Sequence, residues 1–363
     1  MRTAATTGGR SNGRRRLVTA VLAAAIGLTA AACGDREGIA GGGGEAQDAG
    51  GVVNMVMAPD PVWKWMEAQG IKQEMEQAAG VQVLTASSWD EFGAFAGGHA
   101  DVVSAASYEV PELEKQIGER TTIFGKYNSD RSVLAVPADS PAQTLCDLRG
   151  KRIVSHSAVS VTIMWGVYAK EFCGLDLRAG GGDFDLVITD PQNAAGLVTN
   201  GDVDAGLLLP DFSIAALSSG ALRPLYDGKS VSQIYAENFS SDKSDATHPQ
   251  TNVFLARKAW VEQNPEEAGL VVALWDRGVQ EWAAHRDEII ESFPEDFAAE
   301  TPEQKQFIKD WVSQTYDWFV PSAYLDQAWV ERETELFDLM RRNGFVEEDL
   351  PDPDFTILEK PAA

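Results

Sequence analysis

The stretch Leu145-Cys146-Asp147-Leu148-Arg149-Gly150-Lys151-Arg152-Ile153-Val154-Ser155 contains the structural unit that recurs along the first half of this chain. Its first residues predict a short helix, Gly150 predicts a turn, and the β-branched pair Ile153 and Val154 predicts a strand. A helix over about residues 160–172, which Gly174 ends, and a strand at 185–189 continue the series. Strand and helix alternate in this way from residue 52 to residue 209, which predicts parallel sheets with helices on their faces.

Beyond about residue 260 the pattern changes to helices alone. Leu270, Leu274, Gly278 and Trp282 share one helical face, and further helices are expected near 304–319 and 325–342. An isolated strand at 252–256 comes before this helical segment. A chain of 363 residues with two such regions is long enough for two lobes, each with its own core.

The first fifty residues are typical of an exported chain that is anchored by lipid. Four arginines between residues 10 and 16 come before an uncharged apolar stretch from Leu17 to Ala32, and Cys33 follows three alanines. We therefore expect a lipoprotein signal peptide at 1–32, lipidation of Cys33, and a Gly-rich tether over 33–51. An ordinary cleaved signal with a chance cysteine nearby is the alternative, and both the general and the twin-arginine export routes stay open.

Charge and cysteine content narrow the function classes. The chain has 30 Lys and Arg against 55 Asp and Glu, a formal net charge of −25. This balance argues against a nucleic-acid partner and against electrostatic adhesion to anionic lipid. Cys146 and Cys173 remain after Cys33 and can form a disulfide or stay as two buried thiols. No spacing of a metal site occurs, and no metal or cofactor is expected.

Four phrases of the sequence, in this order, resemble the solute-binding proteins of ABC importers, in particular the nitrate, taurine, alkanesulfonate and thiamine-precursor binders (NMT1/THI5-like, SsuA-like). They are Ala100-Asp101-Val102, the stretch 145–153, Gly201-Asp202-Val203-Asp204-Ala205, and Val253-Phe254-Leu255-Ala256 followed by Asn264-Pro265-Glu266. The resemblance implies a two-lobed α/β fold of the periplasmic-binding-protein type II, each lobe a mostly parallel sheet flanked by helices, with a helical C-terminal extension. Lobe one would hold 52–136 and 250–363, and lobe two 137–249. The chain would cross between them near 133–137 and 251–254, and the helical tail would pack on lobe one.

Ligands of open α/β sheets bind at the carboxyl ends of the strands, so the loops there hold the candidate residues. Hydroxyl groups would bind a polar acceptor or cap helices, aromatic rings would stack on a flat ligand or pack in the core, and aspartates would neutralise a cation or cap turns. No arginine was identified in these loops, which favours a neutral or zwitterionic ligand. The candidates are Asp60, Trp63, Ser88, Trp89, Ser107, Tyr108, Ser155, Ser157, Ser160, Thr189, Asp190, Asn193 and Asp211.

The function implied by the resemblance is that of a lipid-anchored, extracytoplasmic and monomeric solute-binding component, which delivers a small organic solute to an ABC permease and its ATPase. Two alternatives stay open. One is an enzyme of the same fold, such as a pyrimidine or menaquinone-pathway synthase, although the export signal and the four scattered histidines argue against it. The other is a lipoprotein that senses a ligand for a different membrane partner.

Overall fold

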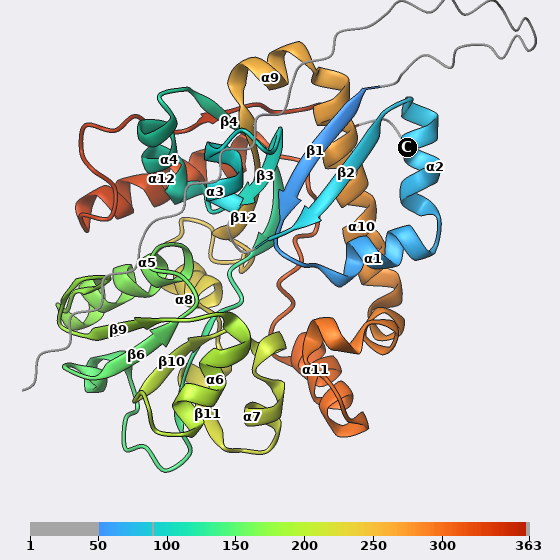
Figure 1. Cartoon of the computed structure of the whole chain (residues 1–363). Coiled ribbons are helices and arrows are strands. Elements are labelled where there is room, and N and C mark those ends of the chain that lie inside the picture. The colour runs from blue at the N-terminus through green and yellow to red at the C-terminus, as the bar shows by residue number, and fades with distance from the viewer. Residues whose placement is uncertain (1–50, 89–90, 361–363) are drawn as a thin grey trace, which may run out of the picture. The chain divides into compact units, whose positions relative to one another are not determined.

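The computed structural model describes residues 51–88 and 91–360 (Figure 1). The predicted signal peptide, the lipidation site Cys33 and nearly all of the tether lie outside the described residues, as does Trp89. Within the described part, no helix has both the length and the apolar character that crossing a membrane requires.

The first lobe is built on a six-stranded sheet with the strand order β13-β4-β12-β3-β1-β2. Strand β1 is parallel to β2 and β3, whereas β12 runs antiparallel to β3 and β4. The strands are β1 (Val52–Met57), β2 (Gln82–Ser87), β3 (Val102–Ala105), β4 (Thr121–Ser129), β12 (Gln250–Arg257) and β13 (Asp354–Phe355). The helices that connect them are α1 (Pro61–Ala68), α2 (Ile71–Ala79), α3 (Glu91–Ala96), η1 (Ser107–Glu109) and α4 (Val110–Ile117).

The second lobe is built on a five-stranded sheet with the order β11-β5-β10-β6-β9. Strand β6 is parallel to β9 and β10, and β5 is antiparallel to β10 and β11. The strands are β5 (Val133–Pro137), β6 (Arg152–Ser155), β9 (Asp185–Ile188), β10 (Ala205–Leu208) and β11 (Leu222–Pro224), with a small ribbon of β7 (Leu177–Arg178) and β8 (Gly181–Gly182). Its helices are η2 (Leu145–Leu148), α5 (Ser160–Tyr168), η3 (Ala169–Cys173), α6 (Pro191–Thr199), η4 (Pro210–Phe212), α7 (Ile214–Ser218), η5 (Tyr226–Gly228) and α8 (Val231–Asn238).

The predicted boundary between the lobes needs one correction. The predicted boundary at residue 136 places nearly all of β5 in lobe one, but the strand pairs with β10 and β11 in the second sheet. The first crossing therefore lies at residues 130–132, directly after β4, and the return lies between α8 and β12. The reason is physical: the apolar run from Val133 is completely buried only when a partner strand lies on each side of it.

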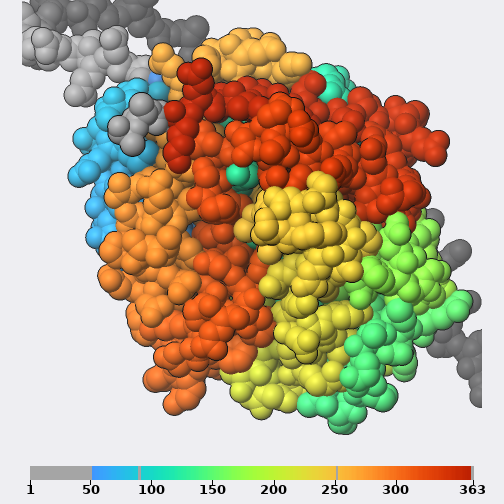
Figure 2. Space-filling model, turned by 180° about the vertical axis from the view of Figure 1, so that it is seen from behind, coloured from blue at the N-terminus to red at the C-terminus, as the bar shows by residue number. Residues whose placement is uncertain are grey.

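The C-terminal helices are α9 (Lys258–Gln263), α10 (Pro265–Ser292), η6 (Pro294–Phe297), α11 (Pro302–Gln314) and α12 (Gln327–Arg342). The tail packs on lobe one as expected, because α10 contacts α1, α2 and β4, but it also packs on the second lobe. Helix α11 packs on α7 of the second lobe, and Phe337 and Met340 of α12 belong to the same apolar cluster as Trp165 of α5. Figure 2 shows the orange and red C-terminal segment beside the yellow segment of the second lobe, so the tail contacts both lobes.

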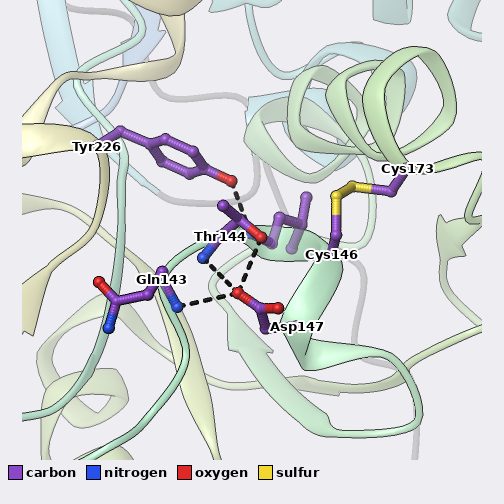
Figure 3. Close-up of a disulfide and its surroundings, with 7 residues drawn as sticks. Gln143, Thr144, Cys146, Asp147, Cys173 and Tyr226 are labelled. Atoms are coloured by element: carbon purple, nitrogen blue, oxygen red, sulfur yellow. Dashed lines mark hydrogen bonds between the residues drawn. A yellow bond between two sulfur atoms is a disulfide. The ribbon is translucent and has the colours of Figure 1, made fainter.

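Cys146 and Cys173 are joined by a disulfide between η2 and η3, with their Cα atoms 5.3 Å apart (Figure 3). The Asp147 carboxylate accepts hydrogen bonds from the backbone N–H groups of Gln143 and Thr144, and the Tyr226 hydroxyl accepts one from Leu145 N. The disulfide lies at the C-terminal end of the helical segment that begins with α5. It therefore fixes the far end of the helix whose beginning faces the cavity described next.

Candidate ligand-binding site

A cavity of about 540 Å³ lies between the two sheets, where the ends of several strands of both lobes meet. The first lobe contributes the residues after β1, β2 and β3, the start of α3, Glu109 and Asn252, and the second lobe contributes the residues after β6, β9 and β10. Arg131, in the crossing between the lobes, completes the lining. The lining residues are Ala58, Ser88, Glu91, Phe92, Ser104, Ala105, Ala106, Glu109, Arg131, His156, Ser157, Val159, Ser160, Val161, Asp190, Pro191, Leu209 and Asn252.

Four of the candidates predicted from the sequence line this cavity: Ser88, Ser157, Ser160 and Asp190. The remaining described candidates are not among the lining residues. Asp60, Trp63, Ser107, Tyr108, Ser155 and Asp211 are buried in the protein around it, whereas Thr189 is half-buried and Asn193 is exposed. Trp63 stacks on Trp275 of α10 with ring centroids 5.4 Å apart, so its ring packs in the core.

Residues 155–160 make hydrogen bonds around the start of α5 and also contribute Ser157 and Ser160 to the cavity lining. The Ser155 hydroxyl accepts a hydrogen bond from Thr162 Oγ1 at 2.8 Å, and the Ser157 hydroxyl accepts one from Val159 N at 3.2 Å. Ser160 has a φ of 44°, in the left-handed region that favours glycine. A non-glycine residue held there stores local strain at the lining of the cavity, where α5 begins.

Arg131 corrects the expectation that the binding loops contain no arginine. Its Nε and Nη2 donate to the two carboxylate oxygens of Asp211 at 2.8 and 2.9 Å, and its guanidinium lies 5.3 Å from the ring centroid of Trp318. Nη1 makes no hydrogen bond to any residue that the structure describes. The sequence analysis does not include Arg131 among the candidates, because it predicts the crossing at 133–137, after this residue. A charged residue between two buried strands was the signal that could have identified it.

Glu109 is the second lining residue that the sequence reading missed. Its Oε2 accepts a hydrogen bond from Ala106 N at 3.0 Å. Burial raises the pKa of this carboxyl to about 7, against the lowering effect of the backbone N–H groups of Ala106 and Ser160. Because Ser160 belongs to the second lobe, Glu109 contacts both sides of the cavity. A glutamate three residues after the N-cap residue of a short helix, here Ala106, is the capping pattern that could have identified it.

The histidine in the cavity carries no charge at neutral pH. Burial, together with the nearby Arg131, lowers the pKa of His156 to about 4. Behind the lining, burial raises the pKa of Asp60 and of Asp130 to about 6 each, although both carboxyls also accept hydrogen bonds. Among the residues that the structure describes, no group of three His, Cys, Asp or Glu side chains could hold a metal ion.

Comparison with known proteins identifies relatives that bind small molecules. Residues 60–229 match the family described as "ABC transporter, phosphonate, periplasmic substrate-binding protein". Among curated proteins, none matches the sequence.

Solved structures share the fold at low sequence identity. The periplasmic aliphatic sulphonate binding protein SsuA from Escherichia coli superposes with a TM-score of 0.60 at 16% identity, over 86% of this chain and 95% of that one. The alkanesulfonate-binding protein SsuA from Xanthomonas axonopodis pv. citri, bound to MOPS, gives 0.59 at 18%, over 83% and 94%. The ligand-binding component of an ABC-type import system from Staphylococcus aureus, with zinc bound, gives 0.53 at 10%, over 84% and 96%.

The predicted resemblance and fold class are therefore confirmed: the chain has the two-lobed fold of the periplasmic solute-binding proteins of ABC transporters, and over residues 60–229 its sequence matches a family of these proteins.

Proposed function

We propose that this chain is the extracytoplasmic solute-binding component of an ABC importer, that it captures a small organic solute between its lobes, and that it delivers the solute to a permease driven by an ATPase. The observation that carries the proposal is the cavity of about 540 Å³ between the two sheets, lined from both lobes and from the crossing at Arg131. Its volume is in the range of small-molecule sites.

Capture follows from the way in which the lobes are connected. The chain crosses between the sheets at residues 130–132 and again before β12, and such crossings act as hinges when two lobes close on a ligand. A solute that contacts both sides of the cavity binds the closed form better than the open form and shifts the equilibrium toward it. Glu109 and Ser160, which interact across the cavity, are placed to contribute to the closed form.

The anchor at Cys33 and the tether over 33–51 belong to the same proposal, and so does action as a monomer. A thioether-linked lipid would hold the protein at the membrane surface, and a Gly-rich tether would let it reach the permease. The names of the matching family and of the SsuA relatives make organic phosphonates and sulfonates the first compounds to try.

The test uses the purified protein and the compound that it carries. Mass spectrometry of the denatured protein should identify a small organic molecule. Adding that molecule to stripped protein should reduce the radius of gyration in small-angle X-ray scattering and give a saturable heat of binding. Chemical conversion of the compound by the protein, or the absence of any compound that binds and compacts it, would overturn the proposal.

A further inference from the structure

We propose that Glu333 and His248 form a pH-sensitive switch between the lobes, which keeps the lobes packed together while Glu333 carries a proton and lets them separate when this carboxyl ionises. The inference goes beyond the proposed function, because it concerns how the lobes are held together and requires no solute. It rests on the place of the two side chains in the fold, on their complete burial, and on the polar atoms that they leave without good hydrogen bonds.

Helix α12 is attached to both lobes along one face, and Glu333 lies where the attachment changes. Trp329, one turn before Glu333, packs in the apolar cluster of the first sheet. Phe337, one turn after Glu333, belongs to the cluster of the second lobe that contains Trp165. Residues four apart share a face of a helix, so the three side chains form one row. A movement of one lobe relative to the other must therefore change the contacts of α12 close to Glu333.

Side chains from both lobes enclose the pair. His248 lies in the return crossing before β12, and its ring centroid is 5.6 Å from that of Tyr235 on α8 of the second lobe. From η1 of the first lobe, the Ser107 hydroxyl is close enough to Glu333 to lower its pKa, and the charge of Glu333 acts on Tyr108. We call these five residues the junction. Figure 2 shows the red C-terminal segment against the yellow segment of the second lobe, where the junction is covered from the back.

The polar atoms of the pair lack well-formed hydrogen bonds. Both ring nitrogens of His248 and both carboxyl oxygens of Glu333 are buried without a hydrogen-bond partner of good geometry among the residues that the structure describes. The Nε2 and Oε1 atoms of the pair are 3.4 Å apart. Buried polar groups are normally hydrogen-bonded, and well-packed apolar side chains of similar size often stabilise a site at least as well as a buried ionisable pair. The pair therefore makes the junction sensitive to charge rather than strong.

The proton on Glu333 decides whether the pair can stay buried. Burial raises the pKa of Glu333 to about 8 and lowers that of His248 to about 3, so neither is charged at pH 7. Above pH 8 the carboxyl ionises, and the neutral imidazole cannot balance its charge. Because an unpaired buried charge is costly, the ionised form favours an arrangement in which water reaches Glu333 between the lobes. Glu109 lines the cavity and belongs to η1 like Ser107, so this separation also changes the cavity.

The other titratable groups at the junction do not replace this effect. Burial raises the pKa of Tyr108 and of Tyr235 above the ordinary value, so both stay neutral in mildly alkaline solution. Arg332 is paired with Asp245 at 2.9 Å. The groups that face the pair are Tyr108 from η1, Lys126 from β4, Asp130 from the first crossing, Tyr235 from α8, Asp245 from the return crossing, and Arg332 and Glu335 from α12.

Hydrogen exchange of the backbone amides, followed by mass spectrometry, tests the switch in protein stripped of any bound compound. The wild type and E333Q are compared at about pH 6.5 and about pH 9.5, on the two sides of the pKa of Glu333. Glutamine keeps the shape of the side chain and cannot ionise. At pH 9.5 we expect the amides of η1, of residues 240–249 and of α12 to exchange at least about threefold faster in the wild type than in E333Q. At pH 6.5 the two proteins should exchange at equal rates.

Two controls separate a switch from a general loss of stability. Glu331 is exposed on the same helix, so E331Q should behave as the wild type does at both pH values. Strands β4 and β10 lie inside the two sheets, and their amides should exchange equally in the wild type and in E333Q at pH 9.5. In small-angle X-ray scattering, the radius of gyration should increase from pH 6.5 to pH 9.5 in the wild type and in E331Q, but not in E333Q.

Infrared difference spectra between the wild type and E333Q detect the proton itself. The C=O band of a protonated carboxyl should be present at pH 6.5 and lost at pH 9.5. Absence of this band at pH 6.5, equal exchange of α12 in the two proteins at pH 9.5, or faster exchange that extends equally to β4 and β10 would overturn the inference. Because no solute enters these measurements, their failure leaves the proposed function standing, and failure to find a solute leaves the switch standing.

Discussion

The charged groups between the two lobes differ sharply from those on the outer surface. The set that we call the interlobe seam consists of Asp60, Asp130, Arg131, Asp211, His248 and Glu333. Five of them are buried, and the side chain of Arg131 is 12% exposed. On the surface, pairs such as Lys229–Glu237 keep a third or more of each side chain exposed. Burying a charge costs free energy unless the charge is paired or neutralised. The groups of the seam carry this desolvation cost, whereas the exposed surface pairs do not.

Two effects reduce this desolvation cost in the seam. Arg131 and Asp211 pair as ions, whereas other members change their protonation. Burial raises the pKa of Glu333 to about 8 and lowers that of His248 to about 3, so both groups are neutral at pH 7. Their nearest polar atoms, His248 Nε2 and Glu333 Oε1, are 3.4 Å apart, and neither side chain is exposed. The comparison teaches that stability should respond to pH and to charge removal through the seam far more than through the surface.

The largest expected effect concerns Glu333. Its pKa in the folded protein is about 8 and its ordinary value is 4.5, so the folded state binds this proton more tightly than the unfolded chain does. The stability that this proton contributes is complete below about pH 4.5 and is lost as the pH rises through 8. Because glutamine does not titrate, the unfolding free energy of E333Q should increase relative to that of the wild type by about 4 kcal/mol between pH 4.5 and pH 8.

Urea denaturation across this pH range measures the difference between E333Q and the wild type. The difference in unfolding free energy between the two proteins removes the contributions of other groups that titrate in both. The groups that face Glu333 or His248 are Ser107, Tyr108, Lys126, Tyr235, Asp245 and Arg332. His248 acts in the opposite direction: its contribution is lost as the pH falls from 6.5 through 3. A pH-independent difference between the two proteins would show that Glu333 does not hold a proton in the fold.

The second expected effect, of intermediate size, concerns Asp211. The variant D211N leaves the buried guanidinium of Arg131 without its bidentate partner, which should cost about 3 kcal/mol of unfolding free energy at pH 7. Asp60 and Asp130 can compensate for part of the loss by ionising more fully, which would lower their pKa values. Adding R131M to D211N should recover much of the stability, because no unpaired charge then remains. A loss below about 1 kcal/mol in D211N would contradict the argument.

The fold was largely predictable because its signals are local. Alternation of apolar strands and helices, with glycines such as Gly150 and Gly174 at the turns, is visible in any short window of the chain. The assignment of β5 failed because a buried strand has the same apolar sequence whichever sheet it joins. Likewise, the amphipathic patterns of α11 and α12 predict helices but do not say which lobe covers each apolar face.

The site was predictable only in part. The rule that ligands bind at strand ends identified Ser88, Ser157, Ser160 and Asp190, because this rule depends on chain order alone. It could not choose between neighbours on one short helix: Ser107 and Tyr108 are buried away from the lining, whereas Glu109 is part of it. That choice depends on the direction of each side chain in η1, which is set by packing against residues far away in the sequence.

The smallest expected effect is at the exposed pair Lys229–Glu237. It sets the lower limit for what a charged pair contributes to stability in this protein. Lys229 Nζ donates to both carboxylate oxygens of Glu237 at 2.6 and 2.9 Å, which is as short as the contacts of Arg131 with Asp211. Distance alone would therefore rank the two pairs as equals. Water competes for both exposed side chains and screens their charges, so E237Q should change the unfolding free energy by no more than about 0.5 kcal/mol. Measured beside D211N under the same conditions, a loss at Glu237 as large as that at Asp211 would mean that contact geometry, and not burial, determines what these charges contribute.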